Sequence, residues 1–132
     1  MIVLTSEEIT RLKSSLSDVP FALEALREIG DCDGDVEDAA ISLALKSDQE
    51  PDTNEWLGDF SKRYRHVVCR EDFRGETLQE EDFTNAQEDI KALMIHLAQQ
   101  TDCPELIALP VVLYVYKTGV DDFCYSFDNS RV

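Results

Sequence analysis

The sequence has few of the residues that interrupt helices. It contains five glycines and four prolines among 132 residues, whereas a fold of many short strands needs frequent turn residues. Long apolar runs are also missing, because the longest, Leu106 to Tyr116, is too short to cross a bilayer and contains Pro110. Polar residues follow Leu4 at once, which argues against a signal peptide. We therefore expect an all-α cytoplasmic protein that does not enter a membrane.

Basic residues are scarce as well. The chain has 12 Lys and Arg against 28 Asp and Glu, so its formal net charge is −16. Direct binding to nucleic-acid phosphates or to an anionic membrane surface needs clustered cations, and this composition disfavours both. An acidic surface instead favours a protein partner with a basic surface, although it also serves solubility alone.

Motifs that would mark a catalytic or metal site are missing. The four cysteines, Cys32, Cys69, Cys103 and Cys124, lie too far apart for a zinc or redox motif. We expect reduced thiols that are buried as small hydrophobic side chains. The sequence contains no phosphate-binding glycine loop, no paired-histidine motif and no nucleophile placed beside a base. No catalytic residue, metal ligand or cofactor is therefore predicted.

One stretch superficially matches a calcium loop. The alternating aspartates at positions 31, 33 and 35 follow the start of an EF-hand, but the positions that need glycine and glutamate hold Val36 and Ser42. A turn between helices, with Asp33 or Asp35 as a helix cap, explains these residues better.

Three short helices are predicted in the first third. Thr5 and Glu8 have capping-box spacing, so the first helix should begin at Thr5 and end before Pro20. The second should run from about Pro20 to Gly30, and the third should begin near Asp35. Apolar residues at helical spacing predict the buried faces of the three helices: Ile9, Leu12 and Leu16; Ala22, Ala25, Leu26 and Ile29; Val36, Ala39, Ala40 and Leu43.

The opening of the third helix carries a family resemblance. Gly34-Asp35-Val36-Glu37, followed by Ala39 and Ala40, gives residues Glu7–Lys46 a likeness to ubiquitin-associated (UBA) domains. The stretch equally resembles the N-terminal module of the bacterial elongation factor Ts. Both resemblances imply a compact three-helix fold, and the resemblance to the elongation factor module implies docking on another protein. Ubiquitin-binding members have a Met-Gly-Phe or Met-Gly-Tyr loop after the first helix, where this chain has residues 16–20, Leu-Ser-Asp-Val-Pro.

The polar stretch Lys46 to Asn54, which contains Pro51, suggests a boundary between a module of residues 1–48 and a helical domain of residues 52–132 packed on it. No family is suspected for the second part. A helix carrying Leu57, Phe60, Tyr64 and Val67, a loop over residues 70–81 and a helix from about Thr84 are expected there. For residues 106–127 we favour helix, with a β-hairpin as the alternative, because a lone hairpin is only marginally stable.

These features favour a non-enzymatic protein-interaction, adaptor or regulatory role. Two groups of residues are candidates for partner contact: Leu16, Val19 and Phe21 in the loop after the first helix, and the basic Lys62, Arg63 and Arg65. The basic residues have a simpler interpretation, since cations near a helix C-terminus are stabilising. Two alternatives remain open: a nucleic-acid mimic with carboxylates in rows on one face, and a small enzyme of unknown reaction.

Overall fold

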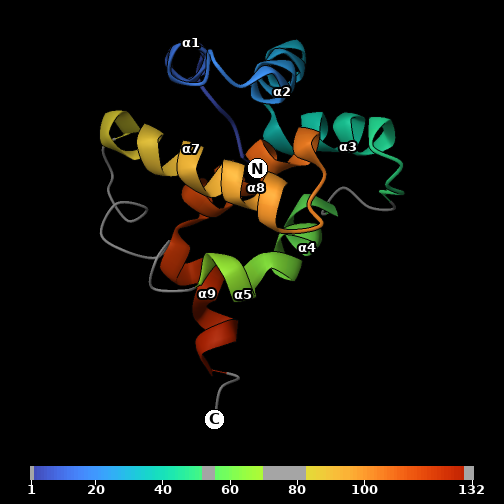
Figure 1. Cartoon of the computed structure of the whole chain (residues 1–132), viewed down its shortest axis with the longest axis vertical. Helices are drawn as coiled ribbons and strands as arrows, with labels where there is room; N and C mark the ends of the chain where they lie inside the picture. The colour runs from blue at the N-terminus through green and yellow to red at the C-terminus, as the bar shows by residue number, and fades with distance from the viewer. Residues whose placement is uncertain (1, 52–55, 70–82, 130–132) are drawn as a thin grey trace.

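The computed structural model describes residues 2–51, 56–69 and 83–129 and confirms the all-α class. Within these ranges the only β feature is an isolated antiparallel bridge between Val3 and Asp35. Figure 1 shows α1 and α2 on one side of α8, with α4, α5 and α9 on the other. The elements run in this order: α1 (Ser6–Ser15), α2 (Pro20–Asp31), α3 (Val36–Lys46), α4 (Trp56–Ser61), the 3-10 helix η1 (Lys62–Tyr64), α5 (Arg65–Val68), α7 (Phe83–Gln100), α8 (Glu105–Thr118) and α9 (Val120–Asn129).

Local capping signals set the starts of the first three helices. The Thr5 hydroxyl accepts from the Glu8 backbone N–H at 3.1 Å, and the Thr5 N–H donates to the Glu8 carboxylate at 3.0 Å, so the predicted capping box is confirmed. Pro20 is the first residue of α2, and Asp35 caps α3 by accepting from the Asp38 N–H at 3.1 Å. Every residue predicted for the inner faces of α2 and α3 is buried.

The turn between α2 and α3 differs from the prediction in one respect. Helix α2 continues past Gly30 to Asp31, and the left-handed backbone needed to reverse the chain occurs at Asp33 (φ 57°) and Gly34 (φ 87°). A Cβ atom on Gly34 would collide with the carbonyl oxygen of Leu4. This close approach lets the Leu4 N–H donate to the Gly34 oxygen at 2.8 Å, which ties the N-terminal segment to the turn.

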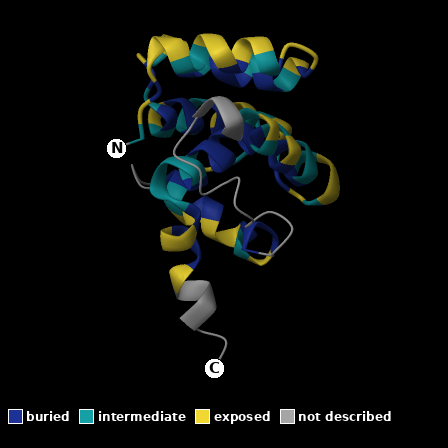
Figure 2. Ribbon diagram, turned by 90° about the vertical axis from the view of Figure 1, so that its left-hand side faces the viewer, coloured by how far each residue is buried: buried dark blue, intermediate teal, exposed yellow. Residues whose placement is uncertain are grey.

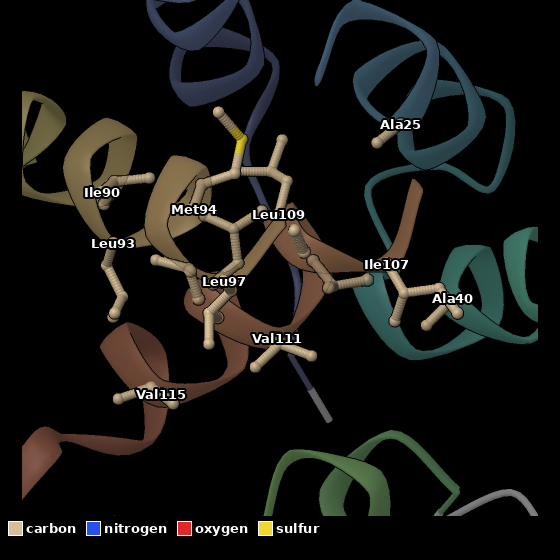
Figure 3. Close-up of a cluster of buried hydrophobic side chains, with 14 of the residues drawn as sticks. Ala25, Ala40, Ile90, Leu93, Met94, Leu97, Ile107, Leu109, Val111 and Val115 are labelled. Carbon is tan, nitrogen blue, oxygen red and sulfur yellow. The ribbon is translucent and has the colours of Figure 1, made fainter. Parts of the chain in front are cut away.

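Helix α8 occupies the centre of the molecule. It is apolar on all sides, with residues 107–113 and Val115 buried, which is typical of a helix enclosed by others. It contacts α2, α3, α4, α7 and α9, so residues from both predicted parts of the chain belong to one hydrophobic core. Figure 3 shows its side chains between those of α7, such as Leu93 and Leu97, and the small Ala25 and Ala40 of α2 and α3.

The ambiguous last third is helical, and the hairpin alternative is wrong. Gly119, with φ 99°, separates α8 from α9, and Pro110 lies inside α8. Helix α7 begins at Phe83, one residue before the predicted start, and its residues Ile90, Leu93 and Leu97 are buried. The predicted loop over residues 70–81 lies outside the described residues.

The single helix expected around Phe60 is instead broken into α4, η1 and α5. Its aromatic side chains pack as a series: Trp56 stacks on Phe60 with ring centroids 4.7 Å apart, and Phe60 meets Tyr64 edge-on at 5.5 Å. All three are buried. Figure 2 shows buried residues where the elements face one another and exposed residues on the outside.

Candidate functional site

Two of the three apolar residues predicted to contact a partner after α1 are buried. Leu16 is fully buried and Val19 is 7% exposed, because both side chains belong to the hydrophobic core. Of these three residues, only Phe21, which is half-buried, lies partly at the surface. The prediction for Leu16 and Val19 is therefore corrected: their apolar side chains complete the packing of α1 and α2 rather than forming a docking surface.

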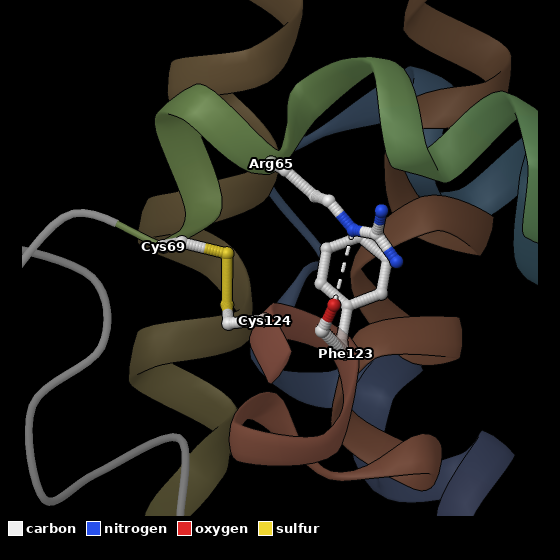
Figure 4. Close-up of a disulfide and its surroundings, with 4 residues drawn as sticks. All are labelled: Arg65, Cys69, Phe123 and Cys124. Carbon is white, nitrogen blue, oxygen red and sulfur yellow. Dashed lines mark hydrogen bonds between the residues drawn. A yellow bond between two sulfur atoms is a disulfide. The ribbon is translucent and has the colours of Figure 1, made fainter. Parts of the chain in front are cut away.

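The basic segment at residues 62–66 has partners within the molecule. Lys62 pairs with Asp59 at 3.8 Å, and the Arg63 guanidinium lies 4.9 Å from the centre of the Phe60 ring. Arg65 lies over the Phe123 ring, and its Nε donates to the Phe123 carbonyl oxygen at 3.1 Å (Figure 4). Arg65 therefore contacts α9, whereas the side chains of Lys62 and Arg63 are exposed.

The expectation of four reduced thiols is wrong for two of the cysteines. Cys69, at the end of α5, forms a disulfide with Cys124 of α9 across 55 residues of sequence (Figure 4). The bond lies beside the contact between Arg65 and Phe123, so three interactions join α5 to α9 at one place. Cys32 and Cys103 remain free thiols. Spacing in the sequence gave no sign of the bond because it depends on how two distant helices pack.

The turn between α2 and α3 concentrates negative charge at the surface. Five carboxylates fall within residues 31–38, which we call the acidic turn: Asp31, Asp33, Asp35, Glu37 and Asp38. Asp31, Asp33 and Asp38 are exposed, and none of the five forms an ion pair with another described residue. The turn is held in place by the α3 cap and by the close contact of Gly34 with Leu4. The acidic turn is therefore an anionic surface that no described cation neutralises.

The thiol within the acidic turn is not activated. Burial raises the pKa of Cys32, and the carboxylates of Glu28, Asp38, Asp35 and Asp31 raise it further because they disfavour a thiolate.

A second feature is a surface pocket with a volume of about 630 Å³ between the segment 63–67 and the end of α7. Its lining includes the chain's two histidines, His66 and His96, together with Arg63 and Asp102. The buried Tyr64 donates its hydroxyl proton to the Asp102 carboxylate at 3.1 Å. The sequence identified each histidine but gave no signal that residues 30 positions apart would line one pocket.

Chemically, this pocket offers charged groups and hydrogen-bonding groups but no described activated nucleophile. Burial, with Cys103 and Asp102 nearby, raises the pKa of Tyr64 well above its usual value. Burial also raises the pKa of Cys103 to about 12, so its thiol stays protonated near neutrality. Cys69, the other candidate thiol, is in the disulfide. The juxtaposition of two histidines with Asp102 keeps the small-enzyme alternative open, but it assigns no reaction.

Other site types are not found in the described ranges. No three His, Cys, Asp or Glu side chains are grouped closely enough to hold a metal ion among these residues. Nor does any helix in the described part of the chain have the length and apolar character needed to cross a membrane. Comparison with protein-family models, curated proteins and solved structures finds no match to this chain.

Proposed function

We propose that the protein is a non-enzymatic adaptor or regulatory protein that binds a basic segment of a protein partner through the acidic turn. The observation that supports this proposal is the group of five carboxylates in residues 31–38, which no described cation neutralises. Neighbouring like charges repel one another, and a cationic partner would relieve that repulsion while the anionic surface speeds its approach.

The surrounding fold supports such a role. The acidic turn joins α2 to α3, whose inner faces are buried, and Asp35 caps α3, so its carboxylates are presented without a large ordering cost on binding. We also propose that α1, α2 and α3 form a UBA-like module, since these three helices coincide with the stretch that resembles this family. Docking on a protein is what the resemblance to the elongation factor module implies.

Charge-neutralising substitutions test the acidic turn. We would replace Asp31, Asp33 and Asp38 by asparagine and leave Asp35 in place because it caps α3. Proteins captured from a lysate by the wild-type chain would be identified, purified and titrated by calorimetry. Three lost charge interactions of about 0.5 kcal/mol each should weaken binding about tenfold. Raising the salt concentration should weaken the wild-type complex more than the complex of the variant.

A control with the same change in net charge distinguishes a site from diffuse attraction. Asp48→Asn, Glu50→Gln and Glu88→Gln change exposed carboxylates that lie on other parts of the surface. This variant should bind the same partner within about twofold of the wild type, since long-range surface charge is screened at physiological salt. Equal weakening in both triple variants would show that the acidic turn is no specific site.

The nucleic-acid mimic remains an untested alternative. Rows of carboxylates on one face would favour it, whereas the described carboxylates occur on α1, α2, α3, α4, α7, α8 and α9. The cytoplasmic location also stays a proposal. The disulfide between Cys69 and Cys124 counts against it, because stable disulfides are rare in reducing compartments.

A further inference from the structure

We propose that the pocket between residues 63–67 and the end of α7 binds a small molecule that carries an oxyanion group, either a phosphate or a carboxylate. This inference is independent of the acidic turn, which uses other residues. The pocket volume of about 630 Å³ lies within the range of ordinary ligand sites, roughly 300–1,000 Å³.

The side chains that line the pocket are unusual for this chain. Lys and Arg number only 12, and His only 2, among 132 residues. Even so, Arg63, His66 and His96 all line this one pocket, and Gln100 adds an amide donor. An oxyanion is strongly repelled by a protein of formal charge −16. The pocket therefore gathers several side chains that can donate hydrogen bonds to an oxyanion.

Several of these groups are already held in position. The Arg63 guanidinium is supported by the Phe60 ring at 4.9 Å, an arrangement that leaves the N–H edge of a stacked guanidinium available for an anion. The Thr101 hydroxyl donates to the Leu97 carbonyl oxygen and accepts from the Cys103 N–H, which fixes the wall after α7. A site built in advance in this way binds with a smaller entropy cost.

Asp102 narrows the class of ligand. One of its carboxylate oxygens accepts from Tyr64 at 3.1 Å, so this acidic group has a fixed place in a pocket otherwise rich in donors. A bare anion would meet repulsion there. A molecule with an oxyanion at one end and a hydroxyl or amino group at the other would satisfy both Arg63 and Asp102. Small hydroxylated phosphates and hydroxy acids have this chemistry.

Titration of the full chain with three probes would test the inference. The probes are inorganic phosphate, citrate and adenosine monophosphate, each at constant ionic strength, with binding measured by calorimetry and by NMR of the imidazole signals. We expect saturable binding that shifts the signals of both His66 and His96. The nucleotide should bind more tightly than inorganic phosphate if a phosphate ester is the source, and citrate should bind best if a carboxylate is. Failure of all three probes to bind at millimolar concentration would overturn the inference.

A neighbouring pair of variants supplies the matched control. Arg63→Gln removes a charge that lines the pocket, whereas Lys62→Gln removes an equal charge one residue away that does not. The first should weaken probe binding at least about tenfold and the second less than about twofold, as expected for a charge-assisted hydrogen bond compared with a distant charge. His96→Gln, which removes one of the two imidazole rings that line the pocket, should also weaken binding. Equal losses for Arg63→Gln and Lys62→Gln, or unchanged binding by His96→Gln, would contradict the proposed site.

Discussion

The helices α1–α3 and the segment Trp56–Cys69 are both helical, but they are stabilised in different ways. Helices α1 and α3 begin at side-chain caps, and α2 begins at a proline, so each start is specified by adjacent residues. The segment Trp56–Cys69 is divided into three short helical pieces, and neither η1 nor α5 has a side-chain cap. Stacked aromatic rings and the disulfide to α9 hold it.

This difference explains why helical periodicity in the sequence predicted α1–α3 well but predicted one continuous helix where the segment Trp56–Cys69 has three short ones. Helices as short as α4 and α5 are unstable alone, so their form depends on the surfaces that they contact. In α1–α3 the local signals agree with the tertiary packing, and the predicted elements are found with small changes in their ends. The same comparison predicts how each region should respond when one of its supports is removed.

The largest effect should come from Leu26→Asp in α2. Leu26 is fully buried in the core that also contains α8, so the variant would place an unpaired charge there at a cost of several kcal/mol. That cost is comparable to the whole stability of a small domain, and the chain should unfold completely. Circular dichroism during urea titration provides the measurement, with the native-like signal lost for all helices together.

Leu45→Asp is the matched control for this substitution. Leu45 lies on α3 and is 65% exposed, so the same change should cost less than about 0.5 kcal/mol. A folded remnant of residues 52–132 in the Leu26→Asp variant, seen as a second unfolding transition, would show instead that the first part is an independent domain.

Reduction of the disulfide should have the next largest effect. Cys69 and Cys124 are 55 residues apart, and opening a loop of that size lowers stability by about 2–4 kcal/mol. Because the bond joins α5 to α9, hydrogen exchange should increase first in residues 65–69 and 120–125. Protection from exchange in α1–α3 should change little, so the two regions would differ clearly in how their stability depends on the disulfide. Equal loss of protection throughout the chain would contradict this local role.

A smaller effect is expected from Lys117→Met, which removes the long-range partner of a capping residue. The Lys117 ammonium lies 2.7 Å from the Glu8 carboxylate, which also completes the α1 capping box. Burial alone would raise the pKa of Glu8, but hydrogen bonds from Lys117 and Thr5 outweigh it and hold that pKa below its ordinary value. The stability from this pair is therefore present above the ordinary glutamate pKa and lost as pH falls through the lowered one.

Urea titrations at pH 7 and at about pH 3 measure this dependence. The variant should be less stable than wild type by about 0.5–1 kcal/mol at neutral pH, and the gap should narrow in acid. Lys13→Met, an exposed substitution on α1, should change stability little at either pH. A difference for Lys117→Met that does not depend on pH would mean that packing of the lysine stem, rather than charge, causes it.

Much of the fold was predictable where adjacent residues carry the information. Thr5 and Glu8, Pro20, and Asp35 mark helix starts, and the apolar residues of α2, α3 and α7 mark their inner faces. The disulfide, the break after Ser61 and the presence of His66 and His96 in one pocket were not predictable in this way. Each depends on residues brought together only by packing around α8. Burial of Leu16 was visible in the periodicity, yet loop position made it look like a contact residue.

The central place of α8 has a consequence for biosynthesis. Helices α2 and α3 bury their apolar faces partly against α8, yet about 60 residues must be synthesised between the end of α3 at Lys46 and the start of α8 at Glu105. At roughly 5–20 residues per second, this delay lasts several seconds on the ribosome. During that interval the apolar faces of the first helices lack their partner and are open to chaperones. Helix α8, which is synthesised late, thus completes the core formed with α2 and α3, which are synthesised early.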